Sequence, residues 1–333
     1  MGRVKDGKGA SELQDSGKQY AIEVSEMRKA YGELVAVDGI SFQVEAGELF
    51  GFLGPNGAGK TTTVNILTGV SLPTSGSASV FGHDVVRDSF RARETINVVP
   101  EVSNAYVEYT AWSNLMFTAS LYGVPRGEAE IRAEELLRAF DLNDKRKTKV
   151  KGFSQGMRRK LVIAMALINR PRVLFMDEPT TGLDVQSVLT IREMVRELNR
   201  EGITVFLTTH NLNEANILCD RVAIINHGRI VATDTPENLK RAARRVQAVE
   251  VSFDHSSLEA EKGLASLAGI KDVSRQRDKL RLITDDPSAT VKAVARFADE
   301  RGLNIVNIDT PGPSLEDVFV ELTGIGVPRG GGE

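Results

Sequence analysis

The chain has 333 residues, of which 41% are hydrophobic and 26% charged, which is ordinary for a soluble protein with one large and one small domain, or two medium ones. Its 42 Lys and Arg against 45 Asp and Glu give a net charge of -3, so the composition provides no general attraction to nucleic acid. The single cysteine, Cys219, excludes an internal disulfide, and no apolar run approaches the roughly 18 residues that cross a bilayer.

The first predicted elements lead into a glycine-rich loop. Residues 1–20 are polar and lack an apolar core, so we expect a disordered extension. The segments "YAIEVSEMRKAY" (20–31) and "ISFQVEAGELFGFLG" (40–54) alternate or run apolar, which predicts strands. After the loop, "GKTTTVNILTGV" (59–70) has helical spacing. The order is therefore strand, loop, helix.

The loop itself, "GPNGAGKTT", satisfies the pattern G-x-x-x-x-G-K-[ST] in the strand-to-helix context of a P-loop. The glycines let backbone N–H groups turn toward phosphate oxygens, and the helix N-terminus adds a positive dipole end. Lys60 is expected to reach the β- and γ-phosphates, and the Thr61 hydroxyl to ligate Mg²⁺. The predicted nucleotide-binding residues of the loop are Gly54, Pro55, Asn56, Gly57, Ala58, Gly59, Lys60, Thr61 and Thr62.

A helical insert is expected at about residues 105–151. Its clearest part, "PRGEAEIRAEELLRAFDL" (125–142), is rich in helix formers. We expect its apolar residues to lie on or near one face: Ile131, Leu136, Leu137, Phe140 and Leu142.

An acidic pair follows the next buried strand, "RVLFMDEP" (172–179). Alone, such a pair is as consistent with a helix N-cap as with catalysis. After a P-loop in an α/β chain it predicts a Walker B element, in which Asp177 holds magnesium and Glu178 orients or deprotonates the attacking water.

Strands then continue to alternate with helices, which predicts a largely parallel sheet with helical crossovers. From about residue 244 a second series reads β-α-β-β-α-β and resembles the ferredoxin-like plan. We assign it to a C-terminal accessory domain over 244–324 without a phosphate loop, and expect 325–333 to be a free tail.

Several further motifs resemble those of ABC-type ATPases over about residues 21–243. "FSQGMRRK" looks like the signature motif, with Ser154, Gln155 and Gly156 at its centre, and "TTGLD" matches the D-loop with Asp184. "TTH" matches the switch histidine at His210. Tyr31 stands where the family has an aromatic residue that stacks on adenine.

The resemblance implies an α/β P-loop NTPase with a RecA-like core, an antiparallel β subdomain and a helical insert. It implies that two such domains, two copies of the chain or one copy and a homologous ATPase, enclose ATP and Mg²⁺ between them. The signature residues would then act on the partner's nucleotide, Glu178 would be the general base and His210 would contact the γ-phosphate.

The chain departs from the family at two positions. Gln155 replaces the commonest signature glycine, and Glu101, in "NVVPEVSNAY", replaces a glutamine that touches magnesium. A carboxylate can also ligate Mg²⁺, so we include Glu101 with Thr61 and Asp177 among the candidate metal ligands.

Within the family, the C-terminal domain resembles that of ATPase subunits of ABC-2-type exporters, the class of daunorubicin-resistance and multidrug efflux proteins. The resemblance implies a separate membrane permease as partner and a peripheral location on the cytoplasmic face of the cell membrane. The alternatives are a soluble ABC ATPase that acts on ribosomes or DNA, and a module that binds ATP without hydrolysing it. The sequence identifies neither the transported substrate nor the permease.

Overall fold

The computed structural model describes residues 19–242, 247–254, 258–276 and 278–324. The expected N-terminal extension lies outside the described residues except for its last two, and the expected tail, residues 325–333, lies wholly outside them.

An antiparallel sheet forms from the N-terminal segment. Its strands are β1 (Tyr20–Tyr31), β2 (Leu34–Glu45), β4 (Ser75–Val80) and β5 (His83–Asp84), in the order β2-β1-β4-β5. The side chains of β1 alternate between buried and exposed over much of its length, because only one face of this sheet is packed against the core.

A six-stranded sheet in the order β10-β9-β3-β8-β7-β6 forms the centre of the molecule. All of its strands run parallel except the edge strand β10, which pairs antiparallel with β9. Every residue of β3, β7 and β8 is buried, as expected for parallel strands covered on both faces. The strands are β3 (Leu49–Leu53), β6 (Ile96–Val99), β7 (Val173–Asp177), β8 (Thr204–Thr209), β9 (Arg221–Asn226) and β10 (Arg229–Asp234).

Phenylalanine rings join the two sheets. Phe42 of β2 stacks on Phe50 of β3 with 5.8 Å between ring centroids, and Phe206 of β8 lies 5.5 Å from Phe52 and 5.4 Å from Phe175. Such aromatic pairs stabilise a fold by more than the burial of their apolar area alone provides. This cluster fixes the antiparallel sheet against one face of the parallel sheet.

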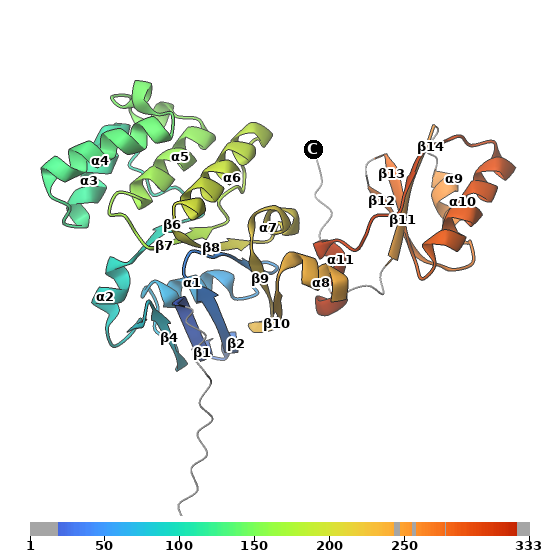
Figure 1. Ribbon diagram of the computed structural model, residues 1–333, viewed down its shortest axis with the longest axis horizontal. Helices are drawn as coiled ribbons and strands as arrows, with labels where there is room; N and C mark the ends of the chain where they lie inside the picture. Colours follow the sequence, from blue (N-terminus) through green and yellow to red (C-terminus); the bar gives the residue numbers. More distant parts are fainter. Residues whose placement is uncertain (1–18, 243–246, 255–257, 277, 325–333) are drawn as a thin grey trace, which may run out of the picture.

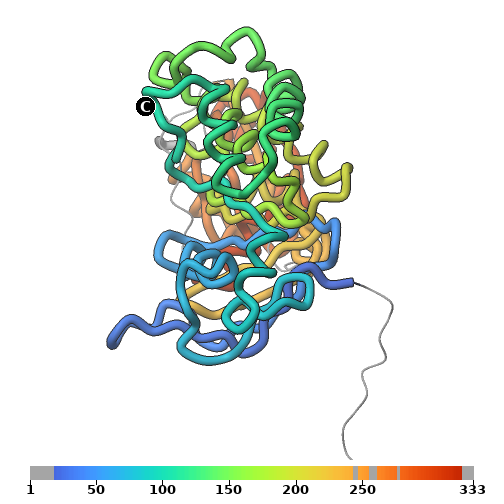
Figure 2. Tube along the Cα trace, turned by 90° about the vertical axis from the view of Figure 1, so that its left-hand side faces the viewer, coloured from blue at the N-terminus to red at the C-terminus, as the bar shows by residue number. Residues whose placement is uncertain are grey.

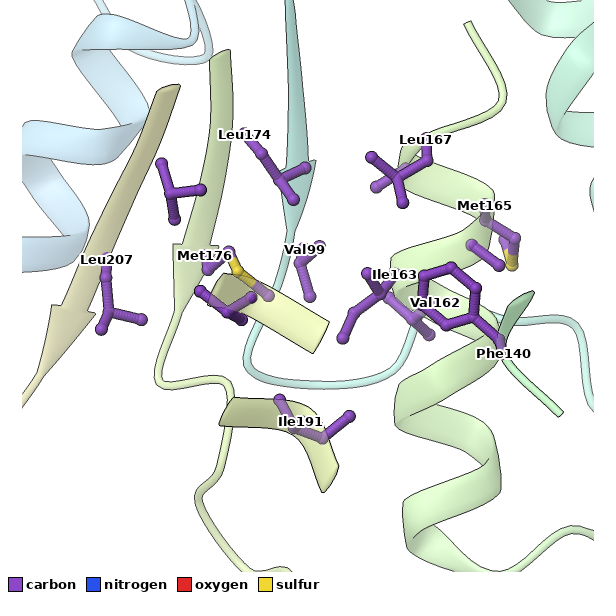
Figure 3. Packing of buried hydrophobic residues seen from close by; sticks show 14 of the residues in the cluster. Val99, Phe140, Val162, Ile163, Met165, Leu167, Leu174, Met176, Ile191 and Leu207 are labelled. Atoms are coloured by element: carbon purple, nitrogen blue, oxygen red, sulfur yellow. The ribbon is translucent and has the colours of Figure 1, made fainter. Parts of the chain in front are cut away.

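Helices cover the other face of the parallel sheet. In Figure 3, Val99, Leu174, Met176 and Leu207 of the strands face Ile163 and its neighbours on α5. Figures 1 and 2 show the helical insert and the antiparallel sheet on opposite sides of the parallel sheet. The helices between residues 60 and 242 are α1 (Lys60–Leu67), which packs into the phenylalanine cluster between the two sheets, and α2 (Ser89–Glu94), α3 (Ala111–Leu121), α4 (Arg126–Ala139), α5 (Gln155–Ala166), α6 (Val185–Arg200), α7 (Leu212–Leu218) and α8 (Pro236–Ala242), with two short 3-10 turns at Asn143–Lys145 and Val150–Gly152.

One expectation for the insert is wrong. Ile131 does not share the buried face of α4, because its side chain is 65% exposed, whereas Ala129 and Ala133 are buried beside Leu136 and Leu137. Ile131 lies two residues from Ala129, which is about 200° around a helix of 3.6 residues per turn. The buried face therefore begins with small alanines, which allow α3 and α4 to pack closely.

The C-terminal unit is a third sheet covered by two helices. Its strand order, β12-β13-β11-β14, is antiparallel throughout and is that of a ferredoxin-like fold, so this prediction is confirmed. A separate apolar core lies between its sheet and its helices. The elements are β11 (Gln247–Phe253), α9 (Leu258–Ala265), β12 (Ile270–Gln276), β13 (Lys279–Thr284), α10 (Pro287–Arg301) and β14 (Ile305–Asp309).

The last helix, α11 (Leu315–Thr323), leaves this unit and packs against α7 and α8 (Figure 1). Leu315, Val318 and Phe319 are buried in the apolar cluster that also contains Leu212 of α7. A capping box between Ser314 and Asp317 begins α11. Asp317 also pairs with Arg281 of β13 at 2.5 Å, so one carboxylate joins the small sheet to the helix. The domain division near residue 244 stays a prediction, and α11 connects its two sides.

We expect the substitution Phe319→Ala to lower the free energy of unfolding by about 3–5 kcal/mol, because it opens a cavity among α7, α8 and α11. The Phe319 side chain is only 5% exposed. Val320→Ala on the exposed side of the same helix is the control and should change stability by less than about 1 kcal/mol. Urea unfolding of both variants measures the difference, and equal midpoints would contradict this packing role of α11.

Candidate functional site

The glycine-rich loop connects β3 to α1 at the carboxyl edge of the parallel sheet. Gly57 and Gly59 have φ of 80° and 108°, which residues with a Cβ atom rarely adopt. A Cβ atom on Gly54 would lie 2.4 Å from the carbonyl oxygen of Ile225, so this position has no room for a side chain. Backbone strain and close packing thus explain these three glycines of the predicted P-loop.

Lys60 begins α1 and is buried beside the loop that it follows. Its Nζ donates to the carbonyl oxygen of Gly54 at 2.7 Å and lies 3.4 Å from Glu178 Oε1. The ammonium group therefore lies inside the loop's curve, where a phosphate would meet both the lysine and the helix N-terminus.

Asp177 ends β7 and faces the P-loop. Its Oδ2 accepts from the Thr61 hydroxyl at 3.4 Å, and its Oδ1 accepts from the Thr208 hydroxyl. Asp177 pairs with Thr208 in the parallel register of β7 and β8, so adjacent strand ends hold the carboxylate. Thr208 is not among the predicted site residues, although the "TTH" motif and the expected parallel sheet were signals for it.

Two contacts hold one oxygen of the Glu178 carboxylate. His210 Nδ1 lies 2.9 Å from its Oε2, and the Thr181 hydroxyl donates to the same oxygen at 3.2 Å. Glu178 has φ of 47°, a left-handed conformation that is uncommon for a residue other than glycine and occurs often at functional sites. The chain thus turns sharply after Asp177 and points Asp177 and Glu178 at different partners.

A cavity of about 410 Å³ brings most of the predicted site residues together. This size is within the range typical of small-molecule sites. Tyr31 lies at its edge, 49% exposed, with Lys29 Nζ 4.7 Å from its ring centroid. The predicted residues that line the cavity are Tyr31, Pro55, Asn56, Gly57, Gly59, Lys60, Thr61, Thr62, Glu101, Asp177, Glu178 and His210.

The donor set fits magnesium. Thr61, Asp177 and Glu101 supply hydroxyl and carboxylate oxygens at one cavity, and Mg²⁺ is usually bound through one or two carboxylates together with phosphate oxygens and water. In the parts of the chain that the structure describes, no group of three or more His, Cys, Asp or Glu residues could hold a metal by itself. The oxygens of Thr61, Asp177 and Glu101 fit a cation that takes its remaining ligands from phosphate and water.

The predicted signature and D-loop residues lie outside that cavity. Ser154 caps α5 by accepting from the Met157 backbone at 3.2 Å, and Gln155 lines a neighbouring hollow that shares Glu101 and Thr181 with the main cavity. Asp184 caps α6 by accepting from the Ser187 backbone at 2.9 Å. Hydrogen bonds from Ser187 lower the pKa of Asp184.

Gly156 allows α5 and α6 to approach each other. A Cβ atom at Gly156 would lie 2.3 Å from Ser187 Oγ. Because Ser187 also bonds to Asp184, the signature segment and the D-loop form one unit on the surface beside the cavity.

Arg159 is a further residue that the sequence analysis missed. It is buried, and its two terminal nitrogens donate to the carbonyl oxygens of Pro100 and Glu101, each at 2.7 Å. Burial lowers the pKa of Arg159, whereas the charges of Glu101 and Asp177 oppose this shift. Arg159 thus joins the signature helix α5 to the loop that carries Glu101.

Two family models and known relatives match the sequence of this chain. Residues 37–181 match the family model described as "ABC transporter", and residues 235–323 match "ATP-binding protein DrrA1-3-like, C-terminal domain". The daunorubicin/doxorubicin resistance ATP-binding protein DrrA of Streptomyces peucetius is 39% identical over 307 residues, which are 91% of this chain and 92% of that protein. The chain belongs to the ABC transporter ATP-binding proteins.

Other relatives and solved structures agree. The linearmycin resistance ATP-binding protein LnrL of Bacillus subtilis strain 168 is 36% identical, covering 91% of this ABC ATPase and 98% of LnrL. A solved ATP-binding subunit of an ABC transporter superposes with a TM-score of 0.61 at 31% identity, over 67% of this chain and 92% of that one. The dimeric ATP-binding cassette MJ0796 with ADP and Pi gives 0.58 at 26% identity, over 64% and 98%. The predicted P-loop NTPase fold and the predicted family are confirmed.

Among the helices of residues 19–242, 247–254, 258–276 and 278–324, none has the length and apolar character that a bilayer span requires.

Proposed function

We propose that this ABC ATPase drives an exporter, and that two ATPase domains close on ATP and reopen after hydrolysis. The observation that carries the proposal is the single cavity that collects the P-loop, the carboxylates of Asp177 and Glu178, and His210. The direction of transport is inferred from relatives whose names refer to drug resistance and to Nod factor export.

The positions of the residues in the cavity support the following roles. We assign Lys60 and the P-loop amides to the phosphates, and Tyr31 to the adenine ring. Thr61, Asp177 and Glu101 would hold Mg²⁺, which neutralises charge on the β- and γ-phosphates when bound. Glu178 accepts a proton from the attacking water, and His210 orients Glu178 and contacts the γ-phosphate.

The second half of each site comes from the facing domain. We propose that Ser154, Gln155 and Gly156 approach the partner's γ-phosphate, together with Asp184 of the D-loop. These residues lie outside the cavity of their own chain, at the start of α5 and α6. The N-terminus of α5, which is capped by the neutral Ser154 hydroxyl, offers its positive dipole end to an anion. Loss of the γ-phosphate removes that contact, so hydrolysis opens the dimer.

An aromatic groove on the helical insert is our candidate for the permease contact. Tyr106, Phe117, Leu121 and Tyr122 line it beside the polar residues Asn97, Asn104 and Thr118. Leu121 is 69% exposed, and the ring of Tyr106 packs edge-on against that of Phe117 with 5.2 Å between centroids. A groove that presents exposed aromatic and aliphatic side chains next to polar ones suits an amphipathic helix from a membrane protein.

The substitution Leu121→Asp tests the permease contact, because it introduces a charge into the aromatic groove. We expect it to abolish co-purification of an integral membrane protein with the tagged full-length chain in mild detergent, while ATP turnover of the isolated protein changes less than about twofold. Ile131→Asp, at a comparably exposed leucine-sized side chain on α4, is the control and should retain the partner. Capture of ribosomal proteins or DNA instead of a membrane protein would contradict the exporter proposal.

The substitution Glu101→Gln tests the metal assignment. The carboxylate should attract Mg²⁺ and repel the γ-phosphate, so we expect ATP affinity of the wild type to depend more steeply on magnesium than that of the variant. The loss of turnover should be smaller than for Glu178→Gln. Titration of ATP across a magnesium series measures both proteins, and superimposable curves would exclude a role for Glu101 at the metal.

A further inference from the structure

A buried carboxylate lies behind the proposed catalytic pair. Glu214, in the first turn of α7, is only 1% exposed, and its Oε1 accepts from the Thr180 hydroxyl at 2.7 Å. Arg192 of α6 places its Nε 3.9 Å from the same oxygen. Glu214 therefore contacts two segments that are distant in the sequence.

Burial of this group is costly for folding. Glu214 Oε2 and Arg192 Nε are both buried without a hydrogen-bond partner. Burial raises the pKa of Glu214, the Thr180 and Thr209 hydroxyls and Arg192 oppose this shift, and the charge of Glu178 adds to it. A buried ionic group of this kind is weak evidence for stability, since well-packed apolar residues often serve as well. The buried Glu214 carboxylate therefore points to a role other than stability.

The segments that Glu214 joins are those that carry Glu178 and His210. Thr180 lies two residues after Glu178, in the turn where Glu178 adopts its left-handed backbone. Asn211, the residue after His210, caps α7 by accepting from the Glu214 backbone at 3.1 Å. One residue thus holds the turn after Glu178 through its side chain and the segment after His210 through its backbone.

We propose that Glu214 is a positioning residue for ATP hydrolysis, which keeps Glu178 and His210 at hydrogen-bond distance by tying the turn at Thr180 to the start of α7. Glu214 does not line the nucleotide cavity and touches no reacting atom. The left-handed turn at Glu178 is unfavourable for a residue with a Cβ atom, so the surrounding contacts must maintain it. The Thr180 hydrogen bond is one of these contacts.

The inference rests on the proposed ATPase function, and the wild type tests that function first. Given wild-type turnover, we expect Glu214→Ala to lower kcat by about tenfold or more while ATP affinity changes less than about twofold, because the base is displaced and the phosphate site is intact. Glu214→Gln should retain most of the turnover, since its amide oxygen still accepts from Thr180. Thr180→Val, which removes only the hydroxyl, should reproduce the loss.

Two further variants separate positioning from stability. Glu48 is also buried, pairs with Arg221 at 3.2 Å and precedes β3, at the strand end opposite the P-loop. Glu48→Ala should lower the thermal midpoint without changing kcat. In a Glu178→Gln background, Glu214→Ala should have almost no further effect, because the base that it positions is absent.

The measurements are kcat, KM, ATP affinity and thermal midpoint for each variant. A Glu214→Ala protein that resembles Glu48→Ala, with a lower midpoint and wild-type kcat, would overturn the inference. If Glu214→Ala does not fold, Thr180→Val decides: wild-type kcat in that variant overturns it. Absence of turnover in the wild type would instead contradict the proposed function.

Discussion

The substitution Glu178→Gln is expected to lower ATP turnover by about 10²–10⁴-fold and to leave ATP binding intact. The amide keeps the shape of the side chain and can still accept a hydrogen bond from His210. In the unsubstituted protein, His210 Nδ1 lies 2.9 Å from the Glu178 carboxylate. It cannot take a proton from water. ATP should therefore stay bound and uncleaved between the two domains.

The readouts are phosphate release and the molecular mass in solution with ATP and Mg²⁺. We expect the variant to accumulate a dimer that the wild type forms only transiently. Glu193→Gln, on the exposed side of α6, is the control and should behave like the wild type. A monomeric Glu178→Gln protein with wild-type turnover would refute the assignment of Glu178 as the general base.

The substitution Lys60→Ala is expected to weaken ATP binding by about a hundredfold. Lys60 is 6% exposed and lies within the curve of the P-loop, so its loss removes charge-assisted bonds to phosphate, each of roughly 1.5–3 kcal/mol. Every 1.4 kcal/mol corresponds to a tenfold change in affinity. Removal of the ammonium also leaves Glu178 without its buried cation, which lies 3.4 Å away.

A fluorescent ATP analogue measures the affinity, and a thermal scan confirms that the variant is folded. Lys149→Ala is the matched control, because Lys149 is exposed and pairs only with Glu108 at 3.2 Å among the contacts described. Equal affinities of Lys60→Ala and Lys149→Ala would show that the cavity does not bind phosphate through Lys60.

The sequence by itself determined the parts of the site that are local. The P-loop could be predicted from the sequence because its glycines, Lys60 and Thr61 belong to one strand-loop-helix unit. The backbone conformation of that unit requires particular residue types. Asp177 and Glu178 could be predicted because they stand at the end of a fully buried strand. The β-α-β-β-α-β succession of the C-terminal unit is equally local, since it consists of short periodic segments.

Only the tertiary structure decided which distant residues meet. Thr208 reaches Asp177 through the register of two parallel strands, and Arg159 of α5 reaches the backbone of Glu101 in the loop after β6. The sequence does not state the register between two strands or the rotation of a helix about its own axis. The rotation of α4 is the reason that Ile131 was misassigned to the buried face. The packing of α11 on α7 and the burial of Glu214 behind Glu178 and His210 are decided in the same way, because side chains far apart in the chain are brought into contact only when the apolar faces of the helices close on the sheet.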